Sequence, residues 1–288
     1  MRACATGSDY AGKPRRSASI GVRIVRSGIL VYLGLMGVMA FSQSRYIYYP
    51  QRATEEDLMV EARAANLQPW RDSGNRLIGW QSGGTGTTAV IVFHGNAGYA
   101  LHRDIFADAL IQTGPADLQK VFLFEYPGYG ARSGNPSESV IRSAALAAFD
   151  DLTRSGWKRI FLVGESLGSG VACAVAGARP DRVSGLLLLT PFTSLTDVAR
   201  AHYPFFPIRL FLRDTYDSEA ALRNYRGPVV VLVAERDTLV PPALGRRLYE
   251  TYAGPKQFRM DGGRTHNELR ISSTAPWWKE SWSFLLAL

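Results

Sequence analysis

The sequence predicts an α/β fold, with a mostly parallel central sheet, helices on both faces of the sheet and a short cap inserted late in the chain. Three observations predict it. From residue 76 onward, short apolar runs alternate with segments of helical periodicity. The apolar runs show little polar alternation, as expected of strands buried on both faces. Polar motifs follow five of the predicted strands, at the edge where open α/β sheets bind ligands.

Seven apolar runs are predicted strands, and the helices lie between them. The predicted strands are 77–80, 89–93, 121–126, 160–163, 185–189, 229–233 and 257–260. Ser137 is a suitable N-cap for the helix after the third strand, because its hydroxyl can accept a backbone N–H bond. Tyr249 is expected in a helix after Pro241-Pro242, and 277–286 is predicted to be an amphipathic closing helix. With no internal repeat, residues 45–288 are predicted to form one domain.

The one substantial insertion, residues 195–218, is predicted to form the cap. It is rich in aromatic residues: Tyr203, Phe205, Phe206, Phe211 and Tyr216. Its place near the ligand-binding edge of the predicted sheet suggests that these side chains bind an apolar group of a ligand, and packing into the core is their alternative use.

The N-terminus is predicted to hold a membrane segment. Residues 1–26 are basic and are expected to be disordered, whereas 27–44 contain no charge over 18 positions. The arginines before this segment predict a single-pass anchor with the N-terminus cytoplasmic and the domain 45–288 on the exported side. A signal peptide cleaved after Val38-Met39-Ala40, which would leave a secreted protein, is the main alternative. A buried core helix would need a polar face, which this run lacks.

The charge and the cysteines exclude or limit other classes. Of the net charge of +8, residues 1–45 carry +6, from seven basic residues and one acid, so the predicted domain carries only +2. A nucleic-acid partner is therefore not expected, because a binding face should lie on the folded domain. Cys4 and Cys173 lie far apart in the predicted fold, so no disulfide is expected, and Cys173 is predicted to be buried.

A candidate catalytic serine lies in the segment Phe161–Gly170, FLVGESLGSG. An apolar strand, then Gly164-Glu165-Ser166-Leu167-Gly168, then a helix is the context that a nucleophile elbow requires. The turn is sharp, so the positions two residues away on either side must lack side chains. Ser166 is therefore predicted to be the nucleophile.

A serine hydroxyl needs a base to take its proton and an acid to orient that base. Of four histidines, His266 is the predicted base, because it lies in a polar loop after the last strand. His94 is expected to orient the glycine loop that it precedes. His102 is expected at the surface, and His202 is expected either at the surface or against substrate.

Asp237 follows the strand 229–233 and is the predicted acid. A turn or helix-capping role is its structural alternative. Glu235, Asp214 and Asp217 are weaker rivals. The resulting order, Ser166, Asp237 and His266 in the chain, is one of the known orders of a catalytic triad.

The tetrahedral intermediate of acyl transfer puts negative charge on an oxygen, which backbone N–H groups must stabilise. The N–H of Leu167, at the start of the helix after Ser166, is one predicted donor. The loop Gly95-Asn96-Ala97-Gly98 is expected to supply the other, from Asn96, because glycine on both sides lets the backbone approach a substrate.

These motifs resemble the α/β-hydrolase superfamily, and more closely its membrane-anchored α/β-hydrolase domain-containing serine hydrolases. The residues that carry the resemblance are Tyr49-Pro50, His94-Gly95-Asn96-Ala97-Gly98, Tyr129-Gly130, Gly164-Glu165-Ser166-Leu167-Gly168, Asp237, Val240-Pro241 and His266. The segment 203–218 resembles the short cap of that group. Glu125-Tyr126-Pro127 stands where the group more often has Asp-Tyr-Arg. The resemblance covers about residues 45–288.

The resemblance implies a serine hydrolase of esters, thioesters or lipids that uses no metal and no cofactor. We therefore expect an acyl-enzyme on Ser166, a small-molecule or lipid (thio)ester as substrate and a membrane as the partner of the N-terminal segment. An amidase, peptidase or acyltransferase on the same triad is the alternative within enzymes. A catalytically silent membrane-tethered binding protein is the alternative outside them.

Overall fold

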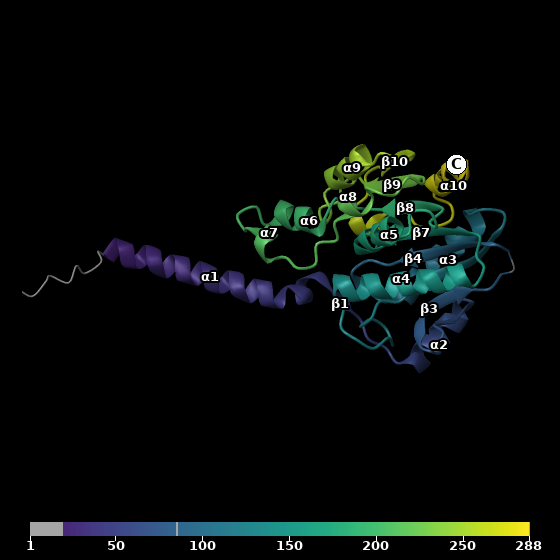
Figure 1. The fold of residues 1–288 in the computed structure, drawn as a ribbon, viewed down its shortest axis with the longest axis horizontal. Helices are drawn as coiled ribbons and strands as arrows, with labels where there is room; N and C mark the ends of the chain where they lie inside the picture. The colour runs from purple at the N-terminus through teal and green to yellow at the C-terminus, as the bar shows by residue number, and fades with distance from the viewer. Residues whose placement is uncertain (1–19, 85, 288) are drawn as a thin grey trace, which may run out of the picture. The chain divides into compact units, whose positions relative to one another are not determined.

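The computed structural model describes residues 20–84 and 86–287 (Figure 1). By its internal contacts the chain divides into two compact units, Met1–Ser42 and Gln43–Leu288. The described part of the first unit lies in helix α1 (Ile20–Ile47), which is long and apolar enough to cross a membrane. At about 1.5 Å per residue, its 28 residues span about 42 Å, against about 30 Å for a hydrocarbon core.

Helix α1 is longer than the predicted segment 27–44. It begins seven residues earlier, at Ile20, so residues 20–26 are helical rather than disordered. This stretch contains no proline, and arginine has good helix propensity, so the helix can continue through it. Residues 1–19, for which disorder was also predicted, lie outside the described residues.

The second unit is built on an eight-stranded sheet of order β10-β9-β8-β7-β4-β6-β3-β2. The strands are β2 (Leu67–Arg71), β3 (Leu77–Ser82), β4 (Thr88–Phe93), β6 (Leu118–Phe124), β7 (Arg159–Glu165), β8 (Gly185–Leu189), β9 (Val229–Ala234) and β10 (Lys256–Asp261). The pairs from β6 through β4 to β10 are parallel, and β3 pairs antiparallel with both β6 and β2. All seven predicted strands are confirmed. The sequence missed β2, which contains Pro69 and lies at the edge of the sheet, where a missing N–H is tolerated.

Helices cover both faces of the sheet, as predicted. One core cluster joins α4 (Glu138–Arg154), α5 (Leu167–Ala178) and α9 (Pro242–Thr251) to side chains such as Ile91 and Phe93 of β4. The other cluster joins α2 (Glu55–Ala64), α3 (Asp104–Thr113) and α10 (Trp277–Leu286) to Val90 and Val92 of the same strand. Adjacent residues of a strand thus point to opposite cores, so the strands are apolar throughout. The predicted cap of α4 is confirmed, because the Ser137 hydroxyl accepts a bond from the Val140 N–H at 3.3 Å.

The cap lies between β8 and β9 and carries α6 (Leu195–His202) and α7 (Ile208–Phe211), which reach away from the sheet, before α8 (Ser218–Ala221) (Figure 1). Its base is closed by a bond from the Leu195 N–H to the Thr215 carbonyl oxygen at 2.7 Å. Its aromatic residues differ in burial, and contact of any of them with an acyl group stays a prediction. Tyr216 is buried in the core, whereas Phe205 is 92% exposed.

Residues 43–51 follow the apolar part of α1 and are here called the exit segment. They contact two parts of the domain. Strand β1 (Tyr49–Pro50) pairs in parallel with β5 (Ala97–Gly98). The Tyr48 hydroxyl donates to Asp214 at 2.7 Å and lies 3.0 Å from the Tyr216 hydroxyl, at the base of the cap. The exit segment therefore joins the predicted oxyanion loop to the cap.

Candidate active site

Ser166 lies on a strained turn between β7 and α5. Its backbone has φ 52° and ψ −116°, a conformation that a residue with a side chain rarely adopts and that occurs at functional sites. A Cβ at Gly164 would lie 2.5 Å from the Gly168 carbonyl oxygen, and one at Gly168 would overlap the carbonyl oxygen of Phe93. Glycine is therefore the residue that fits at both positions, as the nucleophile elbow requires.

The structure brings the predicted acid and base together. Asp237 follows β9, and His266 begins a short 3₁₀ turn, η2 (His266–Glu268), after β10. The Nδ1 atom of His266 lies 2.6 Å from Oδ2 of Asp237. The other carboxylate oxygen of Asp237 accepts bonds from the Leu239 and Val240 N–H groups, at 2.9 and 2.8 Å. The Asp237 side chain is almost wholly buried and is held by these bonds. It therefore fixes the imidazole of His266 with Nδ1 against the carboxylate and leaves Nε2 for another partner.

The rival acids have other partners. Glu235 accepts a bond from the Gly263 N–H at 2.6 Å, so it supports the turn that precedes His266. Asp214 accepts from the Tyr48 hydroxyl, and Asp217 caps α8 through the Ala220 N–H at 2.8 Å.

The remaining histidines also lie outside the acid–base pair. His202 is exposed, and its Nε2 lies 2.8 Å from the Leu239 carbonyl oxygen. His102 is exposed and its ring lies against Tyr99, with 3.7 Å between centroids. Loss of hydration lowers the pKa of His102.

Asn96, a predicted oxyanion donor, is fixed from two sides. Its side-chain amide donates to the Ile47 carbonyl oxygen at 3.0 Å. Its own carbonyl oxygen accepts from the Tyr49 N–H at 2.9 Å and from the Tyr129 hydroxyl at 2.8 Å. Leu167 is the first residue of α5, where backbone N–H groups have no partner within the helix. The use of both N–H groups as oxyanion donors stays a prediction.

A buried polar cluster lies beside the predicted oxyanion loop. His94 and Glu125 are 1% and 0% exposed, and Nε2 of His94 lies 3.3 Å from the Glu125 carboxylate. Nδ1 of His94 lies 2.7 Å from the Gly95 carbonyl oxygen, which can only accept, so this nitrogen donates. The Tyr126 hydroxyl donates to the His94 carbonyl oxygen at 2.6 Å, and burial raises the pKa of Tyr126. His94 thus makes the loop contacts that the sequence predicted for it.

The sequence did not predict an ion pair beside Ser166, the predicted nucleophile. Arg103, in the 3₁₀ turn η1 (Ala100–Arg103), donates through Nε and Nη2 to both carboxylate oxygens of Glu165. A Cβ built on Gly95 would lie 3.7 Å from Nη2 of Arg103 and 3.8 Å from Cβ of Ser166. The predicted oxyanion loop, Arg103 and the turn that carries Ser166 therefore lie close together. A charged residue, Glu165, inside the G-x-S-x-G motif was a signal in the sequence for such a pair, but its partner Arg103 lies 62 residues away.

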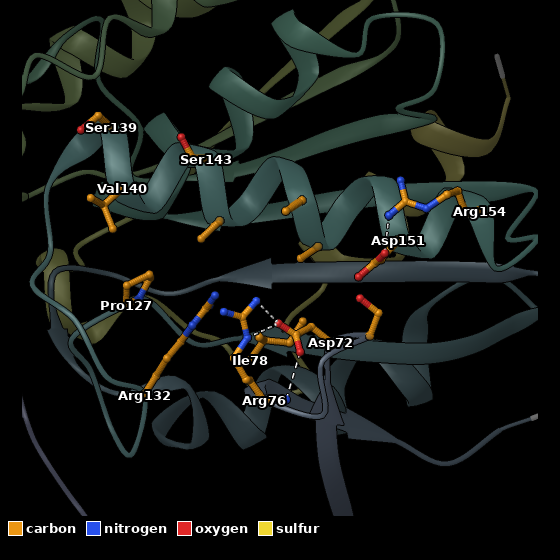
Figure 2. A pocket seen from close by; sticks show the side chains of 14 residues that line it. Asp72, Arg76, Ile78, Pro127, Arg132, Ser139, Val140, Ser143, Asp151 and Arg154 are labelled. Atoms are coloured by element: carbon orange, nitrogen blue, oxygen red, sulfur yellow. Dashed lines mark hydrogen bonds and ion pairs between the residues drawn. The ribbon is translucent and has the colours of Figure 1, made fainter.

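A cavity of about 630 Å³ lies apart from these residues, between the β2–β3 turn and α4 (Figure 2). None of the five predicted site residues lines it. Two of its arginines are paired within it: Arg76 lies 2.7 Å from Asp72, and Arg154 pairs with Asp151. Burial lowers the pKa of Arg132 to about 10, and its guanidinium lies over the Phe124 ring. This cavity is not the candidate catalytic site.

The described residues contain no group of three or more His, Cys, Asp or Glu side chains placed to hold a metal ion.

A parallel sheet in this order, with a strained serine between strand and helix, defines the α/β-hydrolase class. The sequence profile of the alpha/beta hydrolase fold matches residues 88–211. The chain belongs to this family, as its motifs predicted, and it is an enzyme of the hydrolase type.

Three relatives are similar over much of their length. The uncharacterized protein Rv2307c of Mycobacterium tuberculosis is 36% identical over 260 residues, covering 86% of each chain. The alpha/beta hydrolase domain-containing protein WAV2 of Arabidopsis thaliana is 30% identical, covering 68% of this chain and 69% of its own. The lysophosphatidylserine lipase ABHD12 of Xenopus tropicalis is 29% identical, covering 66% of this chain and 54% of its own.

Solved structures share the fold at low sequence identity. The esterase Pf2001 of Pyrococcus furiosus has a TM-score of 0.60 and 17% identity, covering 84% of this chain and 97% of its own.

Proposed function

We propose that the chain is a serine hydrolase of carboxylic esters or thioesters that works through an acyl-enzyme on Ser166. The single observation that carries the proposal is the 2.6 Å contact between His266 Nδ1 and Asp237. These two residues follow neighbouring strands, β9 and β10, and Ser166 follows β7. In a parallel sheet the carboxyl ends of the strands meet at one edge, which is where ligands bind in open α/β sheets.

The proposed reaction has two halves. The Ser166 oxygen attacks the acyl carbon while Nε2 of His266 takes the hydroxyl proton, and Asp237 stabilises the imidazolium that forms. The carbonyl oxygen becomes an oxyanion that the N–H groups of Leu167 and Asn96 stabilise. The intermediate collapses, His266 gives its proton to the leaving alcohol or thiol, and the acyl group stays on Ser166. A water molecule, whose proton His266 takes, then attacks the acyl carbon in the same way. The carboxylic acid leaves, and the proton returns from His266 to the Ser166 oxygen.

The proposed substrate class is a lipid ester or other acyl ester. Support comes from the similarity to a lysophosphatidylserine lipase and from the apolar helix α1. We propose that α1 is retained as a single-pass anchor. The arginines before its uncharged part favour a cytoplasmic N-terminus and a catalytic domain on the exported side.

Labelling with a fluorophosphonate probe tests the proposal. Membrane and soluble fractions of cells making the wild type, Ser166→Ala or Ser143→Ala would be labelled. Ser143 lies exposed on α4 and serves as the matched control. We expect a full-length labelled band in the membrane fraction of the wild type and of Ser143→Ala, and no band for Ser166→Ala. A folded wild-type protein that is not labelled would contradict an activated serine.

Two further readouts refine the proposal. A labelled band in the soluble fraction, shortened at its N-terminus, would contradict the anchor and favour cleavage of a signal peptide. Protease added to sealed membrane vesicles of known sidedness would test the orientation, because only a catalytic domain outside the vesicle is digested.

A further inference from the structure

The outer part of the cap carries apolar and basic side chains on its surface. We define the cap face by six residues: Tyr203, Phe205, Leu210, Arg200, Arg209 and Arg213. Phe205 and Leu210 are 92% and 79% exposed. Large apolar side chains exposed within one short insertion make it a candidate for contact with a membrane or a protein.

The outer part of the cap carries basic side chains. Arg209 and Arg213 are exposed, whereas Arg200 lies 3.7 Å from the Asp197 carboxylate. Residues 198–213 contain three arginines and no carboxylate and carry a net +3, whereas the cap as a whole, residues 195–218, also contains Asp197, Asp214 and Asp217 and has no net charge. The remainder of the domain is close to neutral, since residues 46–288 as a whole carry only +2. Aromatic and aliphatic side chains mixed with arginine are typical of elements that lie in the headgroup region of a bilayer. The basic charge favours an anionic surface.

Hydrogen bonds connect the cap to the chain directly after the apolar part of α1. The side chain of Gln43 donates to the Phe211 carbonyl oxygen at 3.2 Å and accepts from the Arg213 N–H at 2.7 Å. Gln43 is only 8% exposed. It lies beyond the apolar run 28–41 and is the last residue but one of the uncharged segment 27–44, about 1.5 Å from the end of that segment along a helix. A helix that spans a bilayer therefore delivers Gln43, and the cap residues bonded to it, at the membrane surface.

We propose that the cap face docks on the surface of an anionic phospholipid bilayer. This inference rests on the proposed membrane anchor, and it assigns the cap a role that the anchor alone does not need. The apolar side chains enter the boundary between headgroups and acyl chains while the arginines contact lipid phosphates. The cap of a hydrolase for lipid esters would then lie against the layer that contains its substrate.

Site-specific labelling tests the docking without any need for activity. The full chain, in a Cys4→Ser background, would carry a nitrobenzoxadiazole label at Phe205→Cys or Leu210→Cys. The matched control is Val60→Cys on α2, which is also strongly exposed, at 65%. Each protein would be placed in nanodiscs of phosphatidylcholine and phosphatidylglycerol in about equal parts, with or without a doxyl-labelled lipid.

We expect the doxyl lipid to quench the labels at 205 and 210 several-fold more than the label at 60. Replacing phosphatidylglycerol by phosphatidylcholine, or raising the salt concentration, is expected to reduce the difference, because both weaken the attraction of the arginines. Equal quenching at all three positions would overturn the proposal. An inactive Ser166→Ala chain should give the same quenching, so a failure of the proposed chemistry is distinguishable from a failure of docking.

A kinetic comparison provides the second measurement. The double variant Phe205→Ser, Leu210→Ser is expected to lose about tenfold in kcat/KM on a long-chain ester embedded in vesicles. Its kcat/KM on a soluble acetate ester should remain that of the wild type. The control variant Val60→Ser should match the wild type on both substrates. Wild-type rates of the double variant on the embedded ester would contradict the docking role.

Discussion

Replacing Asp237 by asparagine separates the orientation of the base from the packing around it. In the native protein one carboxylate oxygen accepts two backbone N–H bonds, at 2.9 and 2.8 Å, and the other faces Nδ1 of His266 at 2.6 Å. The asparagine carbonyl oxygen must take the first position, because an amide NH₂ there would face two donors. Each unsatisfied N–H would cost about 1–3 kcal/mol.

The NH₂ group of the introduced amide would then donate to Nδ1 of His266, which forces the imidazole proton onto Nε2. A protonated Nε2 cannot accept the proton of Ser166, so the nucleophile loses its base. A comparable substitution in another serine hydrolase reduces kcat by about 10⁴-fold, which corresponds to about 5.5 kcal/mol at the transition state. We expect a loss of this size for Asp237→Asn in the hydrolysis of a p-nitrophenyl ester.

Folding should survive this substitution, because the two backbone bonds remain. We expect urea unfolding to give a free energy within about 1 kcal/mol of the wild type. Glu235→Gln is the matched control: its side-chain oxygen can still accept from the Gly263 N–H, so kcat should change little. A kcat for Asp237→Asn within about tenfold of the wild type would refute the assignment of Asp237 as the orienting acid.

Four other predictions concern stability and reactivity. Gly168→Ala should fail to fold stably or lose several kcal/mol of unfolding free energy in urea, because its Cβ would overlap the Phe93 carbonyl oxygen. A variant as stable as the wild type would contradict the close approach of this turn to β4. Tyr48→Phe should lose about 1–2 kcal/mol in the same assay, since it removes the bond to Asp214, and an unchanged value would show that the cap base does not depend on it. Burial raises the pKa of Cys173 to about 12, so the native thiol at pH 8 should react with iodoacetamide at least about 10³-fold more slowly than the unfolded chain. Rapid alkylation of the native protein at pH 8 would contradict the burial. The same raised pKa means that the free energy of unfolding falls as the pH rises above about 9, because there only the unfolded chain loses the thiol proton.

Much of the fold was predictable from local patterns. A strand such as 229–233 is apolar at every position because it is buried on both faces, and that composition is visible without knowledge of its neighbours. The elbow was equally visible. Gly164 and Gly168 lie where side chains would meet backbone, so the sterics of the turn are recorded in the residue types themselves.

The contacts that tertiary structure decided join residues far apart in the chain. Tyr48 meets Asp214 and Tyr216, and Arg103 meets Glu165, yet none of these residues has a neighbour in sequence that indicates its partner. The two-residue strand Tyr49–Pro50 is too short to show periodicity and exists because of its pairing with Ala97–Gly98. Local composition reports backbone conformation and burial, because both act within a few residues. Which polar groups meet depends on the path of the whole chain, and therefore only the folded sheet determined it.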